Sequence, residues 1–527
     1  MAKLIDMTIG EGKRTTLLTS ARMARFIDGN DTFMTKRGEY RFASLHIKND
    51  ASLVFENSRL EKVPLTVGTL ELNYGAVLQG RWLDIRSSDV VVHPGAKIDL
   101  SAQGFPANQG RGAGAYINAV GTGAGHGGYG GGSTYRTGLW YGSTLNPNAT
   151  GSGGGSSTVG KGGAGGGFLK LIVIRNLKMD GEISVKGENA PGIDAGGGSG
   201  GSVWLSAKNL VGNGIITAEG GNGNRNGYSG SGGRIAIYLQ DTMSFEGSLS
   251  AKGGLTTSGS LAAAGTIYTE DNTKRQPRKS LRAENFEGSF AKPTTVIAEP
   301  GISDFSFDQL TVIGSVLLEI TSSNGNNVLA KIENLIDDGN GEIAIRNGQT
   351  FYVAEKQTAE SHFRLRTSIL VEERANLVSS SNVTVVGVRI DLKGKLSNVQ
   401  HLTLESGARF KFAPTSQTAL LKDSKFVFQS KPGSQQLASI ILKTGSVLLL
   451  PPDAKLTVGV LQVKKAVTLN VKSITIKSQV LSLEHLSVLS VSDAVSSKNS
   501  VDCIGKTSQH GGSGGGQIGR ASCRERV

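Results

Sequence analysis

Short runs that alternate between apolar and polar residues, interrupted by glycine, recur along most of the chain. In one type, two or three alternating apolar residues lead to Gly and then Ala or Ser, after which apolar residues resume. This type covers residues 70–78, 402–410 and 440–448, with a shortened version at 310–318. Period-two alternation broken by glycine is typical of a strand, a bend and a second strand. The pattern predicts a nearly all-β protein of short strands.

A second pattern, G-x-[IL]-[ST]-[AV]-[EK]-G, occurs three times at an ungapped spacing of 33 residues. The copies begin at Gly181, Gly214 and Gly247, and a relative covers residues 96–104. Upstream of each copy, an apolar run follows a glycine cluster, and these runs begin at Phe168, Ser202 and Arg234. Each unit is therefore expected to form a strand, a turn, a second strand and a glycine loop.

Strands this short cannot bury an apolar face alone, so the units must stack on one another. We predict a mostly parallel β-solenoid, namely a right-handed β-helix, with a glycine-rich segment of 33-residue units. The other fold considered is a row of small β-sandwich domains. The ungapped register argues against sandwiches for residues 165–255.

A larger repeat indicates how the chain is organised. The string HGGYGGG at residues 126–132 returns as HGGSGGG at residues 510–516, which is 384 residues later. This spacing predicts a tandem array of glycine-rich blocks and spacers. We expect five segments: an N-terminal β-rich segment (residues 1–84), a glycine-rich block (85–270), a basic linker (271–282, DNTKRQPRKSLR), a second β-helix-like segment (283–502) and the start of another block (503–517).

Glycine is concentrated in one part of the chain. Of the 74 glycines in 527 residues, 46 lie between residues 101 and 270. Collagen is excluded because no glycine at every third position is sustained. A chain that is 38% hydrophobic is not a charge-dominated disordered tail, although the block alone could still be a disordered, phase-separating segment.

The last ten residues, 518–527, resemble the translation of a short-read sequencing adaptor (IGRASCRERV). Without them the formal charge falls from +13 to +11, and Cys503 is the one remaining cysteine. A single thiol forms no internal disulfide, so cysteine gives no information on the redox compartment. We therefore expect the chain to be a piece of a longer protein. Neither a signal peptide nor an apolar run of about 18 residues occurs in the sequence.

Positive charge is spread along the chain and does not form a nucleic-acid motif. The 56 Lys and Arg are dispersed, and the RGG repeats of glycine-rich RNA-binding segments are missing. We predict no nucleic-acid partner and no membrane span, but a weak attraction to acidic polysaccharide or to an anionic surface. Polysaccharides and matrix or surface proteins are the expected partners.

Three partial motifs in the sequence resemble known sites of chemistry. Residues 155–162 nearly spell a phosphate-binding loop, but Gly162 replaces the hydroxyl residue that holds magnesium. Residues 125–127 are similar to the GHG of β-helical polygalacturonases, yet the other motifs of that family, NTD, DD and RIK, are missing in that order. Residues 220–230 lack the aspartates of calcium-binding β-rolls. The sequence thus predicts no catalytic residue, no metal ligand and no cofactor.

Aromatic residues gather in the glycine-rich part, which holds seven of the ten Tyr and two of the three Trp. Those expected in strands, Trp204 and Tyr238, are predicted to fill space beside glycines. Four others fall in a turn-rich insertion with few apolar neighbours, where rings can stack on sugars or on a partner. The predicted binding residues are Tyr129, Tyr135, Trp140 and Tyr141.

A succession of motifs carries a resemblance to a known family. The motifs, in order, are HGGYGGG, GSGGG, GGAGGGFLKLIVI, GGGSGGSVWL, GNGIITAEGGNG and GSGGRIAIY. Residues 85–260 are thereby similar to the glycine-rich block of very large eukaryotic proteins whose plant members are described as glycine-rich proteins of unknown function. The resemblance implies a secretory-pathway or cell-surface protein, often anchored in a membrane further downstream.

These observations together favour a non-catalytic, extracellular or cell-surface structural or adhesive module of a larger protein. The alternative is a carbohydrate-active or carbohydrate-binding β-helix protein. Carboxylates that project from adjacent strands into one groove would favour the alternative, since glycoside cleavage needs a pair of them.

Overall fold

The computed structural model describes residues 6–18, 24–25, 32–33, 40–56, 62–132, 136–256, 261–273, 276–288, 292–322, 327–353, 362–379, 382–397, 399, 401–412, 425–426, 437–443, 447–449, 454–463, 468–470, 474–483, 488–490 and 502–504. Within them every regular element is a β-strand and most pairings are parallel, so the predicted all-β class is confirmed. The repeated HGGSGGG string and the adaptor-like residues 518–527 lie outside the described residues. Two compact units divide the chain, Met1–Gly301 with Leu310–Ser323 and Ile302–Gln309 with Asn324–Val527.

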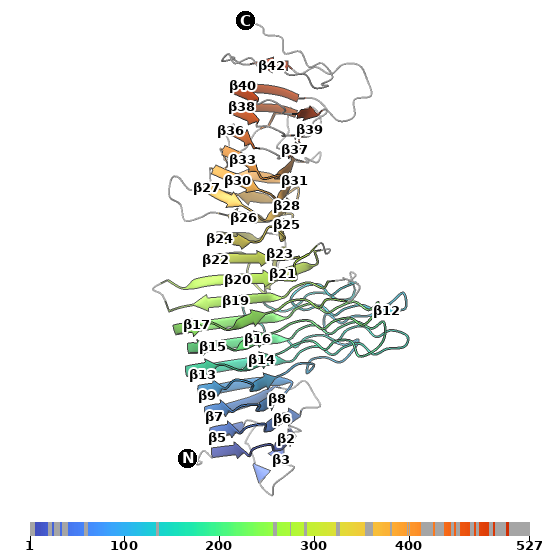
Figure 1. Ribbon diagram of the computed structural model, residues 1–527, viewed down its shortest axis with the longest axis vertical. Coiled ribbons are helices and arrows are strands. Elements are labelled where there is room, and N and C mark those ends of the chain that lie inside the picture. The colour runs from blue at the N-terminus through green and yellow to red at the C-terminus, as the bar shows by residue number, and fades with distance from the viewer. Residues whose placement is uncertain are drawn as a thin grey trace. The chain divides into compact units, whose positions relative to one another are not determined.

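The first unit contains one large sheet whose strands follow each other in chain order (Figure 1). Its strands are β1 (Asp6–Ile9), β5 (Tyr40–Ile47), β7 (Val63–Leu72), β9 (Trp82–Val92), β13 (Phe168–Met179), β15 (Ser202–Gly212), β17 (Arg234–Phe245), β19 (Thr266–Asp271) and β20 (Arg278–Glu284). Neighbours up to β19 pair in parallel. β13, β15 and β17 begin at the three residues where the sequence predicts apolar strands.

A second parallel sheet in this unit takes one strand from each of the same repeats. Its strands are β2 (Arg14–Leu18), β6 (Ser52–Glu56), β8 (Val77–Gln79), β10 (Lys97–Asp99), β14 (Glu182–Ser184), β16 (Ile215–Thr217) and β18 (Ser248–Ser250). β14, β16 and β18 are the three copies of the 33-residue motif. Their central residues, Ile183, Ile216 and Leu249, are in register, which confirms the predicted repeat.

The core of the first unit lies between the inward faces of these two sheets. On β13, Leu169, Leu171 and Val173 are buried while the residues between them are less so, as strand alternation requires. Leu171 pairs in register with Leu205, which pairs with Ile237, so buried side chains form columns across the sheet. Each fully buried aliphatic side chain contributes about 1.5–3 kcal/mol.

Four shorter strands and one further parallel pair complete the first unit. β3 (Ala24–Arg25) pairs antiparallel with β4 (Thr32–Phe33), and β11 (Tyr116–Ile117) pairs antiparallel with β12 (Val120–Gly121). β21 (Thr294–Glu299) pairs in parallel with β23 (Leu317–Ser322). Residues 278–282 of the expected basic linker form the start of β20, which returns antiparallel to β19.

The glycine-rich segments of the first unit are held by backbone hydrogen bonds in three directions. The amides of residues 196–201 donate, in order, to the carbonyl oxygens of Gly155, Tyr228, Glu188, Ser152, Ser231 and Val185. Amides three residues apart therefore point to the same neighbour, either 152–155, 228–231 or 185–188. A period of three is that of a polyproline II-type helix, which forms no bonds within itself and directs its amides outward.

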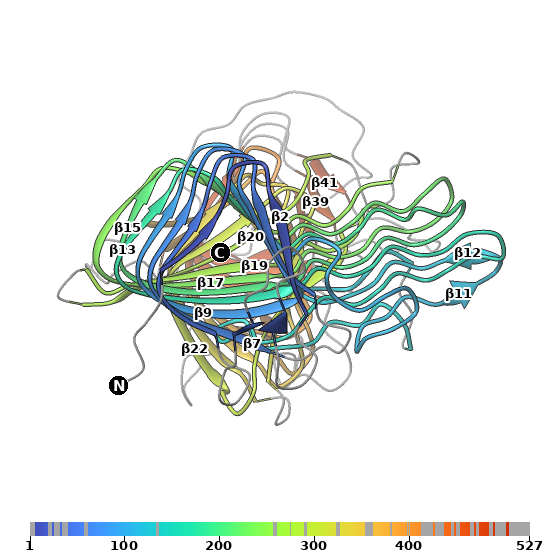
Figure 2. The ribbon, with the colours of Figure 1, turned by 90° about the horizontal axis from the view of Figure 1, so that it is seen from below.

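These segments lie side by side and extend from the sheets to β11 and β12 (Figure 2). We call this array the glycine block, meaning residues 104–131, 138–166, 187–201, 218–233, 251–256 and 261–265. The sequence predicts loops here, and the structure instead shows a packed array. A β-carbon on Gly200 would overlap the carbonyl oxygen of Ala218, and one on Gly123 would overlap that of Ser229. Glycine is needed because the backbones approach so closely.

The second unit is also built of parallel strands. One row contains β24 (Leu329–Asp337), β26 (Thr350–Val353), β29 (Asn376–Val378) and β32 (Lys395–Ser397). A second contains β25 (Glu342–Ile345), β28 (Ser368–Val371), β31 (Arg389–Leu392), β34 (Arg409–Phe412), β37 (Val447–Leu449), β39 (Thr468–Asn470) and β41 (Val488–Ser490). A third contains β27 (His362–Leu365), β30 (Asn382–Val386), β33 (His401–Glu405), β36 (Leu437–Leu442), β38 (Ala454–Val463), β40 (Ile474–Leu483) and β42 (Asp502–Ile504), with β35 (Lys425–Phe426) beside β38. The residues of β22 (Asp304–Ile313) are divided between the units.

The strand–bend–strand pattern that opens the sequence is present in both units. β7 ends at Leu72 and β8 begins at Val77, and between them Gly75 has a φ of 68°. β33 and β34 are joined by the turn that contains Gly407, with a φ of 76°. Glycine occurs at these bends because its backbone enters the left-handed region without strain.

Candidate functional site

The four predicted binding residues do not form one exposed aromatic surface. Tyr129 and Trp140 are half-buried, and Tyr141 is buried. Tyr135 lies outside the described residues. Tyr129 is held through its backbone, since its amide donates to Thr294 O at 3.0 Å. Of the three that the structure describes, Tyr141 takes part in a cluster of titratable side chains, and that cluster is the first candidate site.

Arg234 is the centre of this cluster, which we call the Arg234 cluster and which also includes His126, Tyr141, Thr144 and Glu299. Arg234 is the first residue of β17 and is fully buried, because residues 141–150 cover that end of the strand. Its guanidinium donates to Tyr141 O at 3.1 Å, Thr144 Oγ1 at 2.8 Å, Thr266 Oγ1 at 3.2 Å and Val296 O at 3.0 Å. Burial lowers the pKa of Arg234 to about 10, so the side chain stays charged at neutral pH.

His126 lies beside Arg234 and is held as a neutral imidazole. Its Nδ1 is 2.7 Å from Gly200 O, an acceptor, so the proton is on Nδ1. Burial and then the charge of Arg234 lower the pKa of His126 to about 3. Its Nε2 is buried without a hydrogen-bond partner among the described residues.

Tyr141 and Glu299 close the cluster. The Tyr141 ring stacks on His126 with centroids 4.5 Å apart, and its hydroxyl donates to Thr150 O at 2.7 Å. Burial raises the pKa of Tyr141 to about 12. Glu299 accepts from Ser143 Oγ at 2.5 Å and from the amide of Leu145 at 3.0 Å. These contacts join residues of the glycine block, such as His126, Tyr141 and Thr144, to the start of β17. The cluster therefore holds the glycine block against the large sheet.

A column of aromatic rings on the outer face of the large sheet is the second candidate. The Trp204 and Tyr238 centroids are 5.4 Å apart, and those of Tyr238 and Tyr268 are 5.8 Å apart. Lys170 Nζ lies 5.0 Å from the centroid of the Trp204 ring. The ring faces thus contact neighbours on adjacent strands. A sugar platform needs an open face, so the column serves to pack the sheet through contacts of Trp204 and Tyr238 with neighbouring rings and with Lys170.

Acidic side chains on the large sheet are engaged by bases on neighbouring strands. Asp84 pairs with Lys62, and Asp89 pairs with Arg175. Glu71 lies between His93 Nε2 at 2.9 Å and His46 Nδ1 at 3.0 Å. Hydrogen bonds from these histidines outweigh burial and lower the pKa of Glu71. Each of these three carboxylates is paired with a base, whereas glycoside cleavage needs two carboxylates that face one glycosidic bond.

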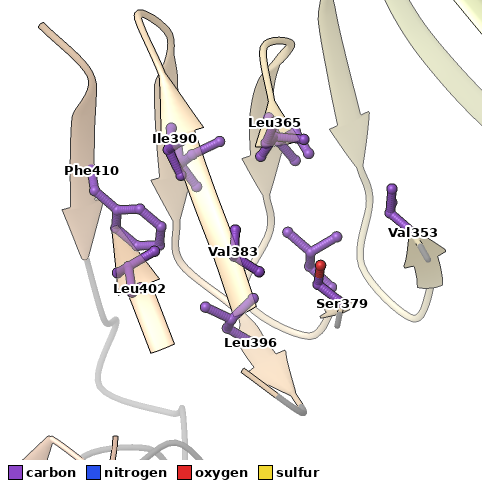
Figure 3. A pocket seen from close by; sticks show the side chains of 11 residues that line it. Val353, Leu365, Ser379, Val383, Ile390, Leu396, Leu402 and Phe410 are labelled. Carbon is purple, nitrogen blue, oxygen red and sulfur yellow. The ribbon is translucent and has the colours of Figure 1, made fainter. Parts of the chain in front are cut away.

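A cavity of about 20 Å³ occurs in the second unit (Figure 3). Its lining is apolar except for Ser379, whose hydroxyl is buried without a partner. The lining residues are Val353, Leu365, Ile369, Leu377, Ser379, Val383, Val385, Ile390, Leu396, Leu402 and Phe410. The volume is about that of one water, so we assign the cavity to imperfect core packing.

Within the described residues no group of three or more His, Cys, Asp or Glu is arranged to hold a metal ion. The same part of the chain has no helix long and apolar enough to cross a membrane. Comparisons with protein-family models, with curated proteins and with solved structures give no match to the chain.

Sequence reasoning missed the Arg234 cluster, although one signal was present. In the 33-residue units, the residue after the glycine cluster is Phe168, Ser202 or Arg234. An arginine at the start of an apolar strand needs acceptors if it is buried. Two of those acceptors come from residues 141–150, whose position over the sheet is not encoded in any local pattern, and the other two are Thr266 Oγ1 and Val296 O.

Proposed function

We propose that this chain is a non-catalytic structural and adhesive module of an extracellular or cell-surface protein, built as a right-handed parallel β-solenoid. Each successive coil of the first unit gives one strand to each of its two parallel sheets, as β13, β14, β15 and β16 do in order. This order supports a solenoid. Connections between parallel strands are right-handed in nearly all proteins, which favours that hand.

The three-directional bonding of residues 196–201 is the observation that carries the structural role. In such an array each segment is fixed by several neighbours through the backbone, and the glycines leave no room between segments for a ligand. The polar side chains within it, such as His126 and Ser231, are used as further hydrogen-bond donors or acceptors. A block held in this way gives stiffness rather than a reaction site.

A location outside the cell rests on the resemblance of residues 85–260 to large glycine-rich eukaryotic surface proteins, to which we propose this chain is related. Polysaccharides and matrix or surface proteins are the partners that such a location offers. The dispersed Lys and Arg favour acidic members of these classes.

The alternative proposal is a carbohydrate-active β-helix. It requires two carboxylates that are free to act on one glycosidic bond. The ion pairs of Asp84, Asp89 and Glu71 favour the structural proposal instead.

The proposal is tested on the full chain in two assays. Limited proteolysis should leave residues 104–131 and 187–233 uncut while the protein is folded, because cleavage needs local opening of the backbone. The amount of reducing ends released from pectic, chitinous and glucan polysaccharides should be the same with the folded protein as with boiled protein. Rapid cutting within the glycine block would contradict the structural role, and release of sugar ends would establish the enzyme.

A further inference from the structure

The outer end of the glycine block carries a cluster of exposed apolar side chains. The described residues include eleven exposed large hydrophobic side chains, and four of them lie here. They are Tyr116, 52% exposed; Val159, 72%; Ile193, 50%; and Tyr228, 36%. Single exposed apolar residues are common on proteins, but a group at one end marks an interaction surface.

Gly121 brings three members of the group together. It pairs with Tyr116 in the β11–β12 hairpin, and its carbonyl oxygen accepts from the amide of Tyr228 at 3.0 Å. Its amide donates at 2.8 Å to the carbonyl oxygen of Asp194, the residue after Ile193. Both tyrosines and the isoleucine therefore belong to segments joined through one residue.

Val159 and two cations adjoin the same place. Ser157 Oγ donates to Ile193 O at 2.6 Å, which holds the turn that contains Val159. Lys161 is fixed beside this turn, since its carbonyl oxygen accepts from the amide of Gly192 at 3.0 Å. Arg225 precedes Asn226, whose side-chain amide donates to Asp194 Oδ1 at 2.8 Å. We call Tyr116, Val159, Lys161, Ile193, Arg225 and Tyr228 the block tip.

The block tip combines exposed rings with exposed cations. Lys161 and Arg225 are exposed, and the nearby carboxylate of Asp194 keeps its negative charge while it accepts from Asn226, so these three side chains sum to a charge of +1. A partner that fits must offer apolar faces to the tyrosines and negative charge to the cations. A second copy of the chain would bring the same cations face to face, and like charges disfavour that contact.

We propose that the block tip binds a linear polysaccharide with one carboxylate on each sugar ring, a polyuronate. Tyrosine rings stack on the apolar faces of pyranose rings, and the guanidinium fork of Arg225 matches the two oxygens of a carboxylate. Asp194 lies close enough to repel a more densely charged sulfated chain. This inference rests on the proposed adhesive function and names the ligand class for it.

The test measures binding of the full chain to polygalacturonate, with heparin, a neutral galactan and anionic lipid vesicles in parallel. Polygalacturonate should bind best. The double variant Lys161→Gln, Arg225→Gln should weaken it at least tenfold, and Tyr116→Ser should weaken it severalfold. Matched controls lie elsewhere on the first unit. Lys178→Gln with Lys208→Gln removes the same charge from side chains 55% and 50% exposed, and Tyr74→Ser removes a 66% exposed ring.

Retained binding in both controls, together with loss in the tip variants, supports the proposal. Equal weakening by the two double variants would overturn it, because the binding would then follow net charge. Preference for heparin or for vesicles would also overturn it. These outcomes are separate from the function test, since release of sugar ends contradicts the structural role whether or not the tip binds.

Discussion

The imidazole Nδ1 of His126 donates to the carbonyl oxygen of Gly200 at 2.7 Å and takes the place of a backbone amide. Gly197 lies three residues before Gly200, and its carbonyl oxygen accepts from the amide of Ala124 at 3.1 Å. A spacing of three residues would bring the amide of Gly127 to the carbonyl oxygen of Gly200, but that amide donates to another segment. A side chain thus completes the three-directional backbone network of the glycine block.

This position makes His126 a source of acid sensitivity. Its pKa of about 3 lies below the value of about 6.5 expected in the unfolded chain. Between these values the unfolded chain holds the extra proton, so the free energy of unfolding rises with pH by up to about 1.4 kcal/mol per unit. The stabilisation is complete above pH 6.5 or so and is lost as the pH falls toward 3.

His126→Asn tests this directly, because the amide of asparagine can donate to Gly200 O but does not titrate. Urea unfolding of the full chain between pH 4 and pH 7, followed by tryptophan fluorescence, should show a shallower pH slope for the variant. Other titrating groups contribute equally to the pH slopes of the wild-type chain and of the variant, so the difference between these slopes reports on His126. Parallel slopes would show that His126 does not titrate as described.

Gly200 itself should not tolerate a side chain. A methyl group there would overlap Ala218 O and would lie 2.6 Å from the amide nitrogen of Gly233. Gly200→Ala is expected to reduce the free energy of unfolding by about 3 kcal/mol, measured by urea titration. Gly10→Ala is the matched control, since its new methyl would meet Lys13 Cγ at an ordinary 3.7 Å. A similar loss of stability in both variants would show that the effect comes from the backbone flexibility of glycine and not from close packing at Gly200.

The strands of this protein could be predicted from its sequence because their information is local. Alternation places Leu169, Leu171 and Val173 on one face whatever lies elsewhere in the chain. The 33-residue spacing also fixed Ile183 beside Ile216, since equal repeats stack in register.

The glycine block and the Arg234 cluster could not be predicted in this way. Glycine has no side chain whose pattern would reveal a partner, and the amides of residues 196–201 bond to three separate segments, between 10 residues (Gly198 to Glu188) and 47 residues (Ser199 to Ser152) away. Burial of Arg234 likewise depends on residues 141–150, which reach it from about ninety positions away in the chain. The turn-rich surroundings of Tyr141 indicate an exposed binding residue, whereas the structure buries its ring against His126.

Arg234 should be among the most costly side chains to remove. Arg234→Met would remove the guanidinium donor of Tyr141 O and Val296 O in a buried site, whereas Thr144 Oγ1 would keep the amide of Ala298. Each unsatisfied buried acceptor costs about 1–3 kcal/mol, so a total loss of about 3 kcal/mol or more is expected in urea unfolding.

The control for this prediction is Arg175→Met on β13 of the same sheet. Arg175 is 62% exposed and pairs with Asp89 at the surface. Its removal should change the free energy of unfolding by less than about 1 kcal/mol. If Arg234→Met were as mild as Arg175→Met, the Arg234 cluster would not fasten the glycine block.

In the second unit, Ser379 offers a stabilising substitution. Its hydroxyl is the one polar group among the residues that line the apolar cavity, and it is buried without a partner. Ser379→Ala removes that unsatisfied group and should raise the free energy of unfolding by about 1 kcal/mol. Ser397→Ala is the counterpart on the neighbouring strand, where Ser397 Oγ donates to Asn376 Oδ1 at 2.8 Å, and it should lower stability by about the same amount. Thermal unfolding of the full chain measures both, and the two melting temperatures should shift in opposite directions. Shifts of the same sign would mean that hydrogen bonding of the hydroxyl does not decide stability in this unit.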